Sequence, residues 1–157
     1  MIEVFDDLLM VLAFGLGAGL SPAAPGTVGS AVGLVAAWPL LRLNPAWHAF
    51  AIALLGVFGV WLCGTVAQRL GEHDPGMIVF DEIVGLLIAA YRLPWRWHWI
   101  LPAFLLYRLF DIVKPWPVSG AEHWFGTGAS IMADDAIAGA LTLGMMWGVN
   151  RLLARRS

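Results

Sequence analysis

Two long stretches of the sequence contain no formally charged residue: residues 8–41, which are 34 positions, and residues 43–68, which are 26 positions. About 20 consecutive apolar residues let a helix cross the hydrocarbon core of a bilayer, so each stretch is long enough to span a membrane. The second stretch contains the clearest candidate span, residues 45–62, with Trp47 and Trp61 suited to the two interfaces. We therefore expect lipid to be the main solvent of this fold.

The overall composition supports this interpretation and excludes several classes of protein. Hydrophobic residues make up 60% of the 157 positions and charged residues 13%, and the mean hydropathy is +0.77. These values exclude intrinsic disorder, nucleic-acid binding through a basic surface and an ordinary water-soluble domain. The acidic start of the chain lacks the basic residues of a signal peptide, so we expect a mature N-terminus.

Several apolar segments are interrupted or short. Residues 20–30 hold two prolines and two glycines, which predicts a helix, an irregular loop near a membrane face, and a second helix. The later uncharged segments, residues 83–91, 97–107 and 136–150, are too short to cross a bilayer unaided. We predict an all-α fold, a small multi-pass membrane helical bundle with broken or re-entrant helices, forming one integral-membrane domain over residues 1–157.

The acidic residues are concentrated in one part of the chain. Eight of the eleven lie between Glu72 and Asp135, and five of these directly adjoin apolar sequence: Asp81, Glu82, Asp111, Asp134 and Asp135. A carboxylate near hydrocarbon is costly unless it is paired or bound to a cation. Converging carboxylates without a cysteine cluster suit a hard divalent ion, Mg²⁺ before Ca²⁺ or zinc. The alternative is that these acids only mark helix starts at the interface.

Two further groups of residues could bind an anion. Arg108, Asp111 and Lys114 recur at three-residue spacing and share one helix face, where they could hold a phosphate beside a metal-binding carboxylate or simply pair with one another. Thr27 and Ser30 lie where a helix is expected to begin, so their hydroxyls and the free backbone amides could cradle a phosphate or merely cap the helix.

Four blocks of sequence occur in the order seen in one enzyme family. They are Gly17-x-Gly-Leu-Ser-Pro22 with Pro25-Gly-Thr-x-Gly-Ser30, His73-Asp-x-Gly-x-Ile-Val-x-Asp-Glu82 with Gly85, Arg108-x-x-Asp-x-x-Lys-Pro-Trp-Pro117, and Ile131-Met-x-Asp-Asp135 with Ala138 and Gly139. Together they cover residues 17–139 and resemble the phosphatidylglycerophosphatase A family. The chain departs from the family pattern at Thr127 and Ser130, where glycines of a turn are expected, so the geometry of that turn is in question.

The resemblance implies a Mg²⁺-dependent phosphatase that hydrolyses the terminal phosphomonoester of phosphatidylglycerophosphate to phosphatidylglycerol and phosphate. The predicted catalytic residues are Asp81, Asp111 and Asp135. The predicted ligands of one or two Mg²⁺ ions are Asp81, Glu82, Asp111, Asp134 and Asp135, with Asp74 as an outer candidate. Arg108, Lys114, Thr27 and Ser30 are predicted to bind phosphate. A remaining carboxylate would act as general base or as covalent nucleophile, and the sequence leaves both routes open.

The family resemblance also implies a place in the cell. We expect a multi-pass protein of the bacterial inner membrane that acts on a phospholipid in the bilayer, with its active site facing the cytoplasm, where such lipids are made. Arg151, Arg155 and Arg156 instead favour a cytoplasmic C-terminus, which would put Asp134 and Asp135 on the opposite side if residues 131–150 span. A re-entrant or tilted last helix would reconcile the two expectations.

Two other function classes are compatible with the composition. A small cation channel or transporter would place its acids along a path through the membrane, and a non-catalytic assembly protein would have replaceable acids. The ordered motifs favour the phosphatase. No nucleic-acid partner is expected, whereas glycines at four-residue spacing could support an oligomer through close helix contacts: Gly15 and Gly19, Gly29 and Gly33, Gly144 and Gly148.

Overall fold

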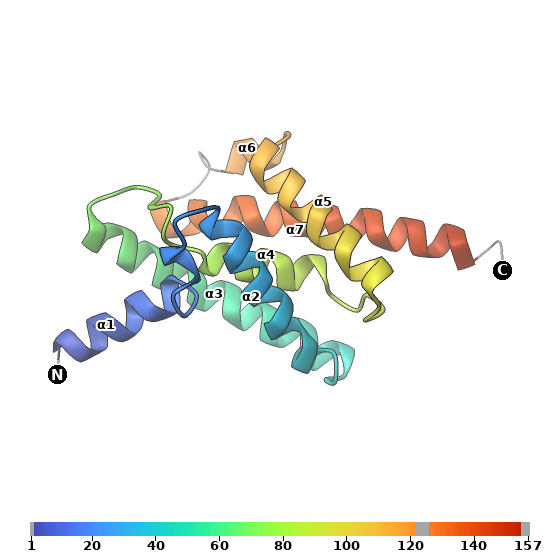
Figure 1. Cartoon of the computed structure of the whole chain (residues 1–157), viewed down its shortest axis with the longest axis horizontal. Coiled ribbons are helices and arrows are strands. Elements are labelled where there is room, and N and C mark those ends of the chain that lie inside the picture. The colour runs from blue at the N-terminus through green and yellow to red at the C-terminus, as the bar shows by residue number, and fades with distance from the viewer. Residues whose placement is uncertain (1, 122–125, 155–157) are drawn as a thin grey trace.

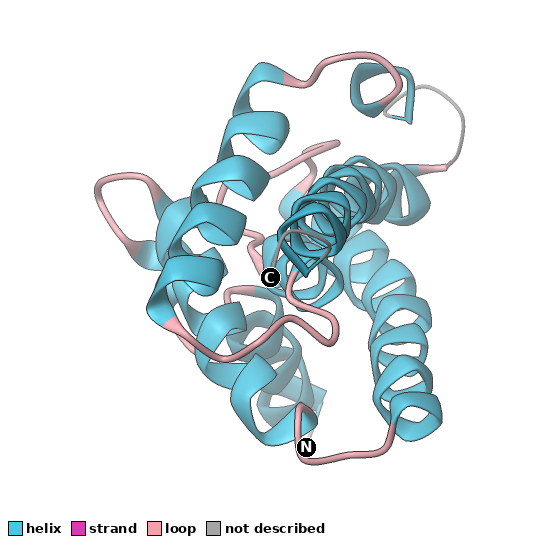
Figure 2. Ribbon diagram, turned by 90° about the vertical axis from the view of Figure 1, so that its right-hand side faces the viewer, coloured by secondary structure: helices cyan, strands magenta, loops and turns pink. Residues whose placement is uncertain are grey.

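The computed structural model describes residues 2–121 and 126–154, and every regular element in these ranges is a helix (Figures 1 and 2). The all-α prediction is therefore confirmed. The elements are α1 (Ile2–Ala13), the short 3₁₀ helix η1 (Ala18–Leu20), α2 (Pro25–Leu40), α3 (Pro45–Leu70), α4 (Phe80–Ala89), α5 (Trp97–Val113), α6 (Val118–Ala121) and α7 (Thr127–Ala154).

Two helices are long and apolar enough to cross a membrane. α3 qualifies over Pro45–Leu70 and α7 over Thr127–Leu153. The predicted span at residues 45–62 therefore lies within α3, which begins with Asn44 capping the amide of Trp47 and Pro45 in the first turn. α7 is one uninterrupted helix of 28 residues, so no re-entrant break lies within Thr127–Ala154.

The interrupted N-terminal stretch is more helical than predicted. Pro25 is the first residue of α2, where its missing N–H costs no hydrogen bond, so residues 25–30 form the first turns of that helix. Only residues 21–24 remain an irregular link between η1 and α2. The stretch before Ile131 is also helical, since the amide of Ser130 donates to the carbonyl of Gly126 at 2.9 Å. Thr127 and Ser130 therefore need no glycine-like turn.

The short helix α4 occupies the middle of the molecule, in contact with α2, α3, α5 and α7 (Figure 1). Its 10 residues would extend only about 15 Å, half the thickness of a bilayer core. Most of its side chains are buried, which is typical of a helix surrounded by protein on all sides. α4 is thus a short helix that does not reach across the bundle. It begins inside the protein, with Asp81 and Glu82 in its first turn.

Glycines allow α4 to approach its neighbours closely. A Cβ on Gly139 of α7 would collide with the carbonyl oxygen of Gly85 on α4, and a Cβ on Gly33 of α2 would come within 2.9 Å of the Ile83 carbonyl oxygen. The predicted glycine pair at positions 29 and 33 is therefore used inside the chain rather than between chains. Gly144, by contrast, has open space around its Cβ direction.

This difference gives a matched pair of substitutions on one helix. Gly139→Ala is expected to lower the free energy of unfolding by about 1–3 kcal/mol, because the methyl group must push α4 and α7 apart. Gly144→Ala is expected to leave it unchanged or raise it by up to about 1 kcal/mol through helix propensity. Thermal unfolding in detergent measures both; equal midpoints for the two variants would contradict the close α4–α7 contact.

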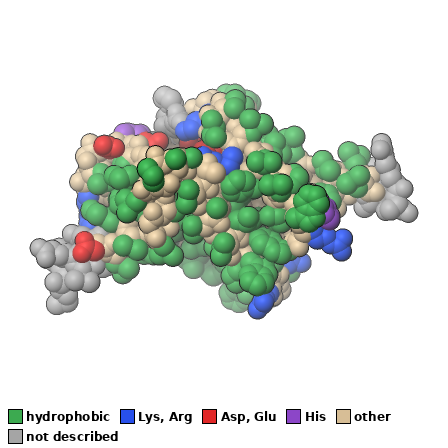
Figure 3. Space-filling model, in the orientation of Figure 1, with side chains coloured by type: hydrophobic (Ala, Val, Ile, Leu, Met, Phe, Trp, Pro, Cys, Tyr) green, Lys and Arg blue, Asp and Glu red, His purple; other side chains and the backbone are tan. Residues whose placement is uncertain are grey.

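Apolar side chains cover much of the outer surface (Figure 3). An exposed row runs along one side of α5, made of Leu101, Leu105, Leu109 and Ile112. α3 likewise exposes Phe50, Leu54 and Val57. A soluble monomer rarely exposes continuous apolar area of this extent, whereas a membrane protein places such rows against lipid. The surface therefore agrees with the two apolar helices.

Candidate active site

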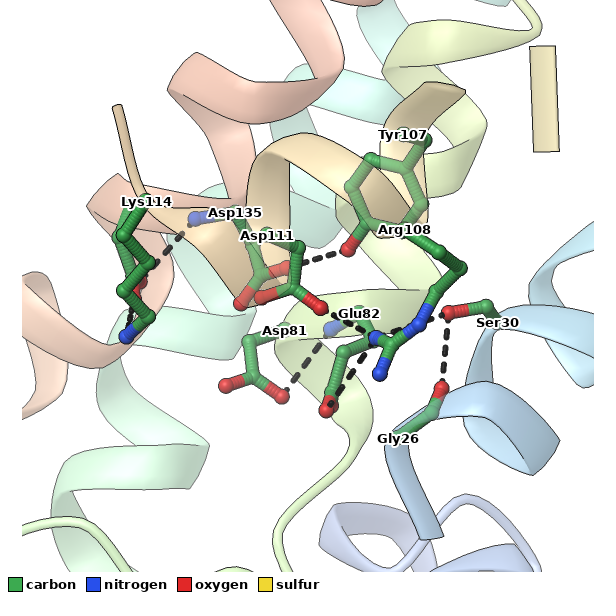
Figure 4. Close-up of polar contacts among 10 residues, drawn as sticks. Gly26, Ser30, Asp81, Glu82, Tyr107, Arg108, Asp111, Lys114 and Asp135 are labelled. Carbon is green, nitrogen blue, oxygen red and sulfur yellow. Dashed lines mark hydrogen bonds and ion pairs between the residues drawn. The ribbon is translucent and has the colours of Figure 1, made fainter. Parts of the chain in front are cut away.

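Four helices bring the conspicuous polar residues of the sequence to one place (Figure 4). α4 supplies Asp81 and Glu82 in its first turn, α5 supplies Arg108 and Asp111 near its end, α7 supplies Asp134 and Asp135, and α2 supplies Ser30. All four of the sequence blocks are thus assembled by the fold. The acids gather around one site rather than along a path through the bundle, unlike the arrangement expected of a channel.

Arg108 is the centre of the contacts in this site. Its Nη1 donates to Asp111 Oδ2 and to Ser30 Oγ, the latter at 3.4 Å, and lies 4.0 Å from Glu82 Oε1. The side chains of Arg108, Glu82 and Asp111 are only 12–15% exposed, so these charges are largely shielded from solvent. One guanidinium therefore links α2, α4 and α5.

The start of α2 is pressed against this guanidinium. Ser30 Oγ donates to the carbonyl of Gly26 at 2.7 Å, and a Cβ on Gly26 would overlap Glu82 Oε1 and come within 3.1 Å of both Arg108 terminal nitrogens. A side chain at this position would therefore require the end groups of Glu82 and Arg108 to move. The first turn has no side-chain cap, and the amides of Thr27 and Val28 donate to the Ala24 carbonyl at 3.0 and 3.2 Å.

Lys114 and Asp111 do not form the local pair that their spacing allowed. α5 ends at Val113, and Lys114 adopts a left-handed conformation with φ 46°, so it does not continue the helical spacing of Arg108 and Asp111. Its Nζ instead donates to Asp134 Oδ2 at 2.7 Å, joining the end of α5 to α7. Arg108 thus pairs with Asp111 and lies near Glu82, and Lys114 pairs with Asp134.

Asp135 has a partner that the sequence motifs did not indicate. Tyr107 is completely buried, and its hydroxyl donates to Asp135 Oδ1. A buried tyrosine needs a partner for its polar end, so a tyrosine inside an apolar helix beside Arg108 was the available signal. Gly85 leaves room for this contact, because a Cβ there would lie 2.6 Å from the Tyr107 hydroxyl.

The neighbouring acids Asp81 and Glu82 share a buried environment. Burial, more than the nearby charges of Glu82 and Asp135, raises the pKa of Asp81 well above its usual value. Burial also raises the pKa of Glu82, although its hydrogen bond with Asp81 and the charge of Arg108 act in the opposite direction. Both carboxyls would release their protons more readily beside an additional positive charge.

The donor set fits a hard divalent cation. The site offers carboxylate oxygens from three helices, and Glu82 Oε2 is buried without a hydrogen-bond partner. Within residues 2–121 and 126–154, no three His, Cys, Asp or Glu side chains are already gathered as a ready metal centre. Asp111, Asp134 and Asp135 are turned toward Arg108, Lys114 and Tyr107.

Two predicted residues lie apart from these contacts. Asp74 is exposed on the loop between α3 and α4, and Thr27 is half-buried in the first turn of α2. In the described part of the chain, neither side chain forms a hydrogen bond or ion pair with the Arg108 group. Ser30 is therefore the hydroxyl that the fold brings to the centre of the site.

Sequence comparisons show which protein family the chain resembles. The phosphatidylglycerophosphatase A family pattern matches residues 11–150. Phosphatidylglycerophosphatase A of Escherichia coli K12 is 38% identical over 140 residues, which are 87% of this chain and 80% of the relative. The protein of the same name from Haemophilus influenzae is 42% identical over 131 residues, 82% of this chain and 80% of the relative.

A third relative has a different name. A protein of Bacteroides thetaiotaomicron, provisionally named a phosphatidylinositol-3-phosphatase, is 38% identical over 140 residues, 84% of this chain and 87% of the relative. No solved structure matches the chain significantly. With four motif blocks joined in one buried site, and a family pattern that covers most of its length, this phosphomonoester hydrolase belongs to the phosphatidylglycerophosphatase A family.

Proposed function

We propose that this enzyme hydrolyses the terminal phosphomonoester of phosphatidylglycerophosphate, producing phosphatidylglycerol and inorganic phosphate. The observation that carries this proposal is the grouping of Glu82 and Asp111 around Arg108, with Asp81 and Asp135 buried nearby, in a chain with exposed apolar surfaces. Two relatives carry the corresponding name. The lipid tails of such a substrate remain in the bilayer while its headgroup reaches the polar site.

We propose Mg²⁺ as the cofactor, held by carboxylates of Asp81, Glu82, Asp111, Asp134 and Asp135. When bound, this ion supplies positive charge that neutralises and polarises the phosphomonoester. Carboxylates that bind the ion would pair less strongly with Arg108 and Lys114, so these two side chains could donate hydrogen bonds to phosphate oxygens. A second group of donors to the phosphate would come from the start of α2: Ser30, Thr27 and the amides of its first turn.

The chemical step has two routes that the same residues could support. In one, a carboxylate accepts a proton from water as the water oxygen attacks phosphorus and the lipid alkoxide leaves with a proton. In the other, an aspartate oxygen attacks phosphorus as the P–O bond to the lipid breaks and the lipid alkoxide takes up a proton; water then hydrolyses the aspartyl phosphate to inorganic phosphate and the free carboxylate. The configuration at phosphorus separates them: with a substrate whose phosphate is made chiral by sulfur and oxygen isotopes, a single in-line displacement by water inverts the configuration, whereas two successive displacements retain it.

A substrate panel tests the proposed specificity. The purified protein would be given phosphatidylglycerophosphate, phosphatidic acid and phosphatidylinositol 3-phosphate in matched detergent micelles, and inorganic phosphate would be measured. We expect the highest kcat/KM for phosphatidylglycerophosphate. Faster release from phosphatidylinositol 3-phosphate would contradict the proposed substrate and place the chain with its Bacteroides relative in specificity.

We further propose that the site faces the cytoplasm in a bacterial inner membrane. Arginines also gather at the other end of the bundle, where Arg92 donates to the Leu43 carbonyl at 3.4 Å and lines one surface pocket with Arg151. By the positive-inside rule these arginines predict the reverse orientation, with that end in the cytoplasm. Labelling of single engineered cysteines decides between the two orientations. The native Cys63 is fully buried, so it contributes little background labelling.

The two engineered positions would be Gly76, exposed beside the site with open space around it, and Asn150, exposed near the end of α7. With a membrane-impermeant maleimide on intact cells, Gly76→Cys is expected to react only after lysis. Asn150→Cys is expected to react without lysis. The opposite pattern would place the active site on the outer side of the membrane.

A further inference from the structure

An apolar groove runs along the surface between α3, α4 and α7. Its central cavity has a volume of about 320 Å³ and is lined by Ala53, Gly56 and Val60 of α3, Val84 and Ile88 of α4, and Ala133 of α7, among others. A second cavity of about 240 Å³ shares Ala53 and Ile88 with it and continues toward Ala49 and Leu143. The two cavities therefore form one elongated depression.

The length and position of this groove match one leaflet of a bilayer. From Ala49 to Val60 the groove follows α3 for about 16 Å at 1.5 Å per residue, close to half of a hydrocarbon core of about 30 Å. No charged residue lines either cavity. α3 and α7 are also the two helices long and apolar enough to cross the membrane, so the groove lies at the depth of acyl chains.

The groove becomes polar toward the end of the bundle that holds the acids. A third cavity of about 340 Å³ shares Val60 and Ala129 with the apolar groove and is lined further along by Thr65 and Gln68. α3 ends at Leu70, shortly before the loop that leads to Asp81. An apolar groove with a polar end is complementary to a lipid molecule, which has an apolar chain and a polar headgroup, rather than to water or ions.

The walls of the groove are continuous with the active site. Val84 follows Asp81 by three positions on α4, so the two lie on the same side of that helix. On α7, Ala133 and Ala136 line the groove, whereas Asp134 and Asp135 lie on the opposite face of the helix and contact Lys114 and Tyr107, so the groove reaches the acids along α4. A hydrocarbon chain in the groove would therefore contact the same two helices that hold these acids.

We propose that this groove binds one acyl chain of the lipid substrate and so positions the phosphorylated headgroup at the acids. This inference rests on the proposed lipid phosphatase function and adds an acyl-chain subsite to it. The subsite predicts that the enzyme distinguishes long-chain from short-chain substrates, because only a chain long enough to occupy the groove fixes the headgroup at the site.

Gly56 allows a direct test, since a Cβ at this position meets no atom within 4 Å and a larger side chain can fill the groove without moving the fold. Gly56→Phe would be compared with Gly148→Phe, which also projects into open space but lies on α7 outside the groove. Ala53→Phe is a second groove-filling variant, at an exposed position. Each would be assayed on dioleoyl and dibutyryl phosphatidylglycerophosphate.

The groove-filling variants are expected to lower kcat/KM for the dioleoyl lipid by at least about tenfold, because the groove no longer positions the headgroup, and to leave the dibutyryl lipid unaffected. Gly148→Phe is expected to match the wild type on both. Wild-type values for both groove variants, or equal losses on both lipids, would overturn the acyl-chain subsite while leaving the phosphatase proposal intact. A wild type inactive on both lipids would overturn the phosphatase proposal and the subsite with it.

Discussion

Asp81→Asn is expected to abolish phosphate release while making the metal-free protein more stable. Asp81 is buried beside Glu82, and the structure shows no cation paired with it directly in the described residues. A carboxyl whose pKa is raised on folding lowers the free energy of unfolding at pH values above its ordinary titration range. The neutral asparagine removes this cost and keeps the oxygen that accepts from the Glu82 amide at 3.0 Å.

The activity loss should be about 100- to 10,000-fold, the range associated with removal of a general acid or base. Activity would be measured as inorganic phosphate released from phosphatidylglycerophosphate, and stability as the thermal midpoint in EDTA. Glu72→Gln is the matched control, because Glu72 is an exposed acid on the same loop that precedes α4. Full activity of Asp81→Asn would remove this residue from the proposed site.

Asp111→Asn and Asp135→Asn should lose activity to a similar degree but differ in stability. Asp111 pairs with Arg108, so its neutralisation leaves a buried guanidinium with fewer acceptors and lowers the thermal midpoint. The amide oxygen introduced by Asp135→Asn would still accept from the Tyr107 hydroxyl, so that variant should retain its midpoint more closely. Measurements of phosphate release and of the thermal midpoint would therefore distinguish the roles of the three carboxylates.

Arg108→Met is the second change with a large expected effect. The guanidinium contacts groups on α2, α4 and α5. Its loss removes the proposed hydrogen-bond donor to the phosphate and also leaves Glu82 and Asp111 without their shared cation. We expect phosphate release to fall by about 100- to 1000-fold, as when a single electrostatic stabiliser of a transition state is removed. The thermal midpoint should fall as well, because buried carboxylates without a cation are costly.

Arg108→Lys separates charge from geometry. A lysine keeps the positive charge but cannot reach Ser30, Glu82 and Asp111 at once, since it lacks the planar fork of the guanidinium. It should restore most of the stability lost in Arg108→Met but little of the activity. Arg96→Met, at the exposed start of α5 on the far side of the bundle, is the control. An active Arg108→Lys enzyme would show that any cation suffices there.

Local patterns predicted the parts of this site that depend on single helices. The acid pair Asp81-Glu82 before an apolar run marks the start of α4, and the three-residue spacing of Arg108 and Asp111 places them on one face of α5. Uncharged length alone predicted the span that became α3. These features follow from helix geometry and from the cost of charge in lipid, so they are readable without tertiary structure.

Contacts between helices were beyond such reasoning. The pairing of Lys114 with Asp134 depends on a left-handed residue at the end of α5, and the partnership of Tyr107 with Asp135 depends on how closely α4 lies against α7 at Gly85. The apolar groove likewise exists only once three helices pack together. Spacing within one segment contains no information about these distances.

The central claim is that buried acids at one end of this bundle form a Mg²⁺-dependent lipid phosphatase site. The most direct measurement is phosphate release from phosphatidylglycerophosphate by the purified protein in EDTA, and again after Mg²⁺ is restored. We predict no release in EDTA and recovery of activity with Mg²⁺, which Asp81→Asn should fail to show. Equal release in EDTA and in Mg²⁺, or no release under either condition, would contradict the claim.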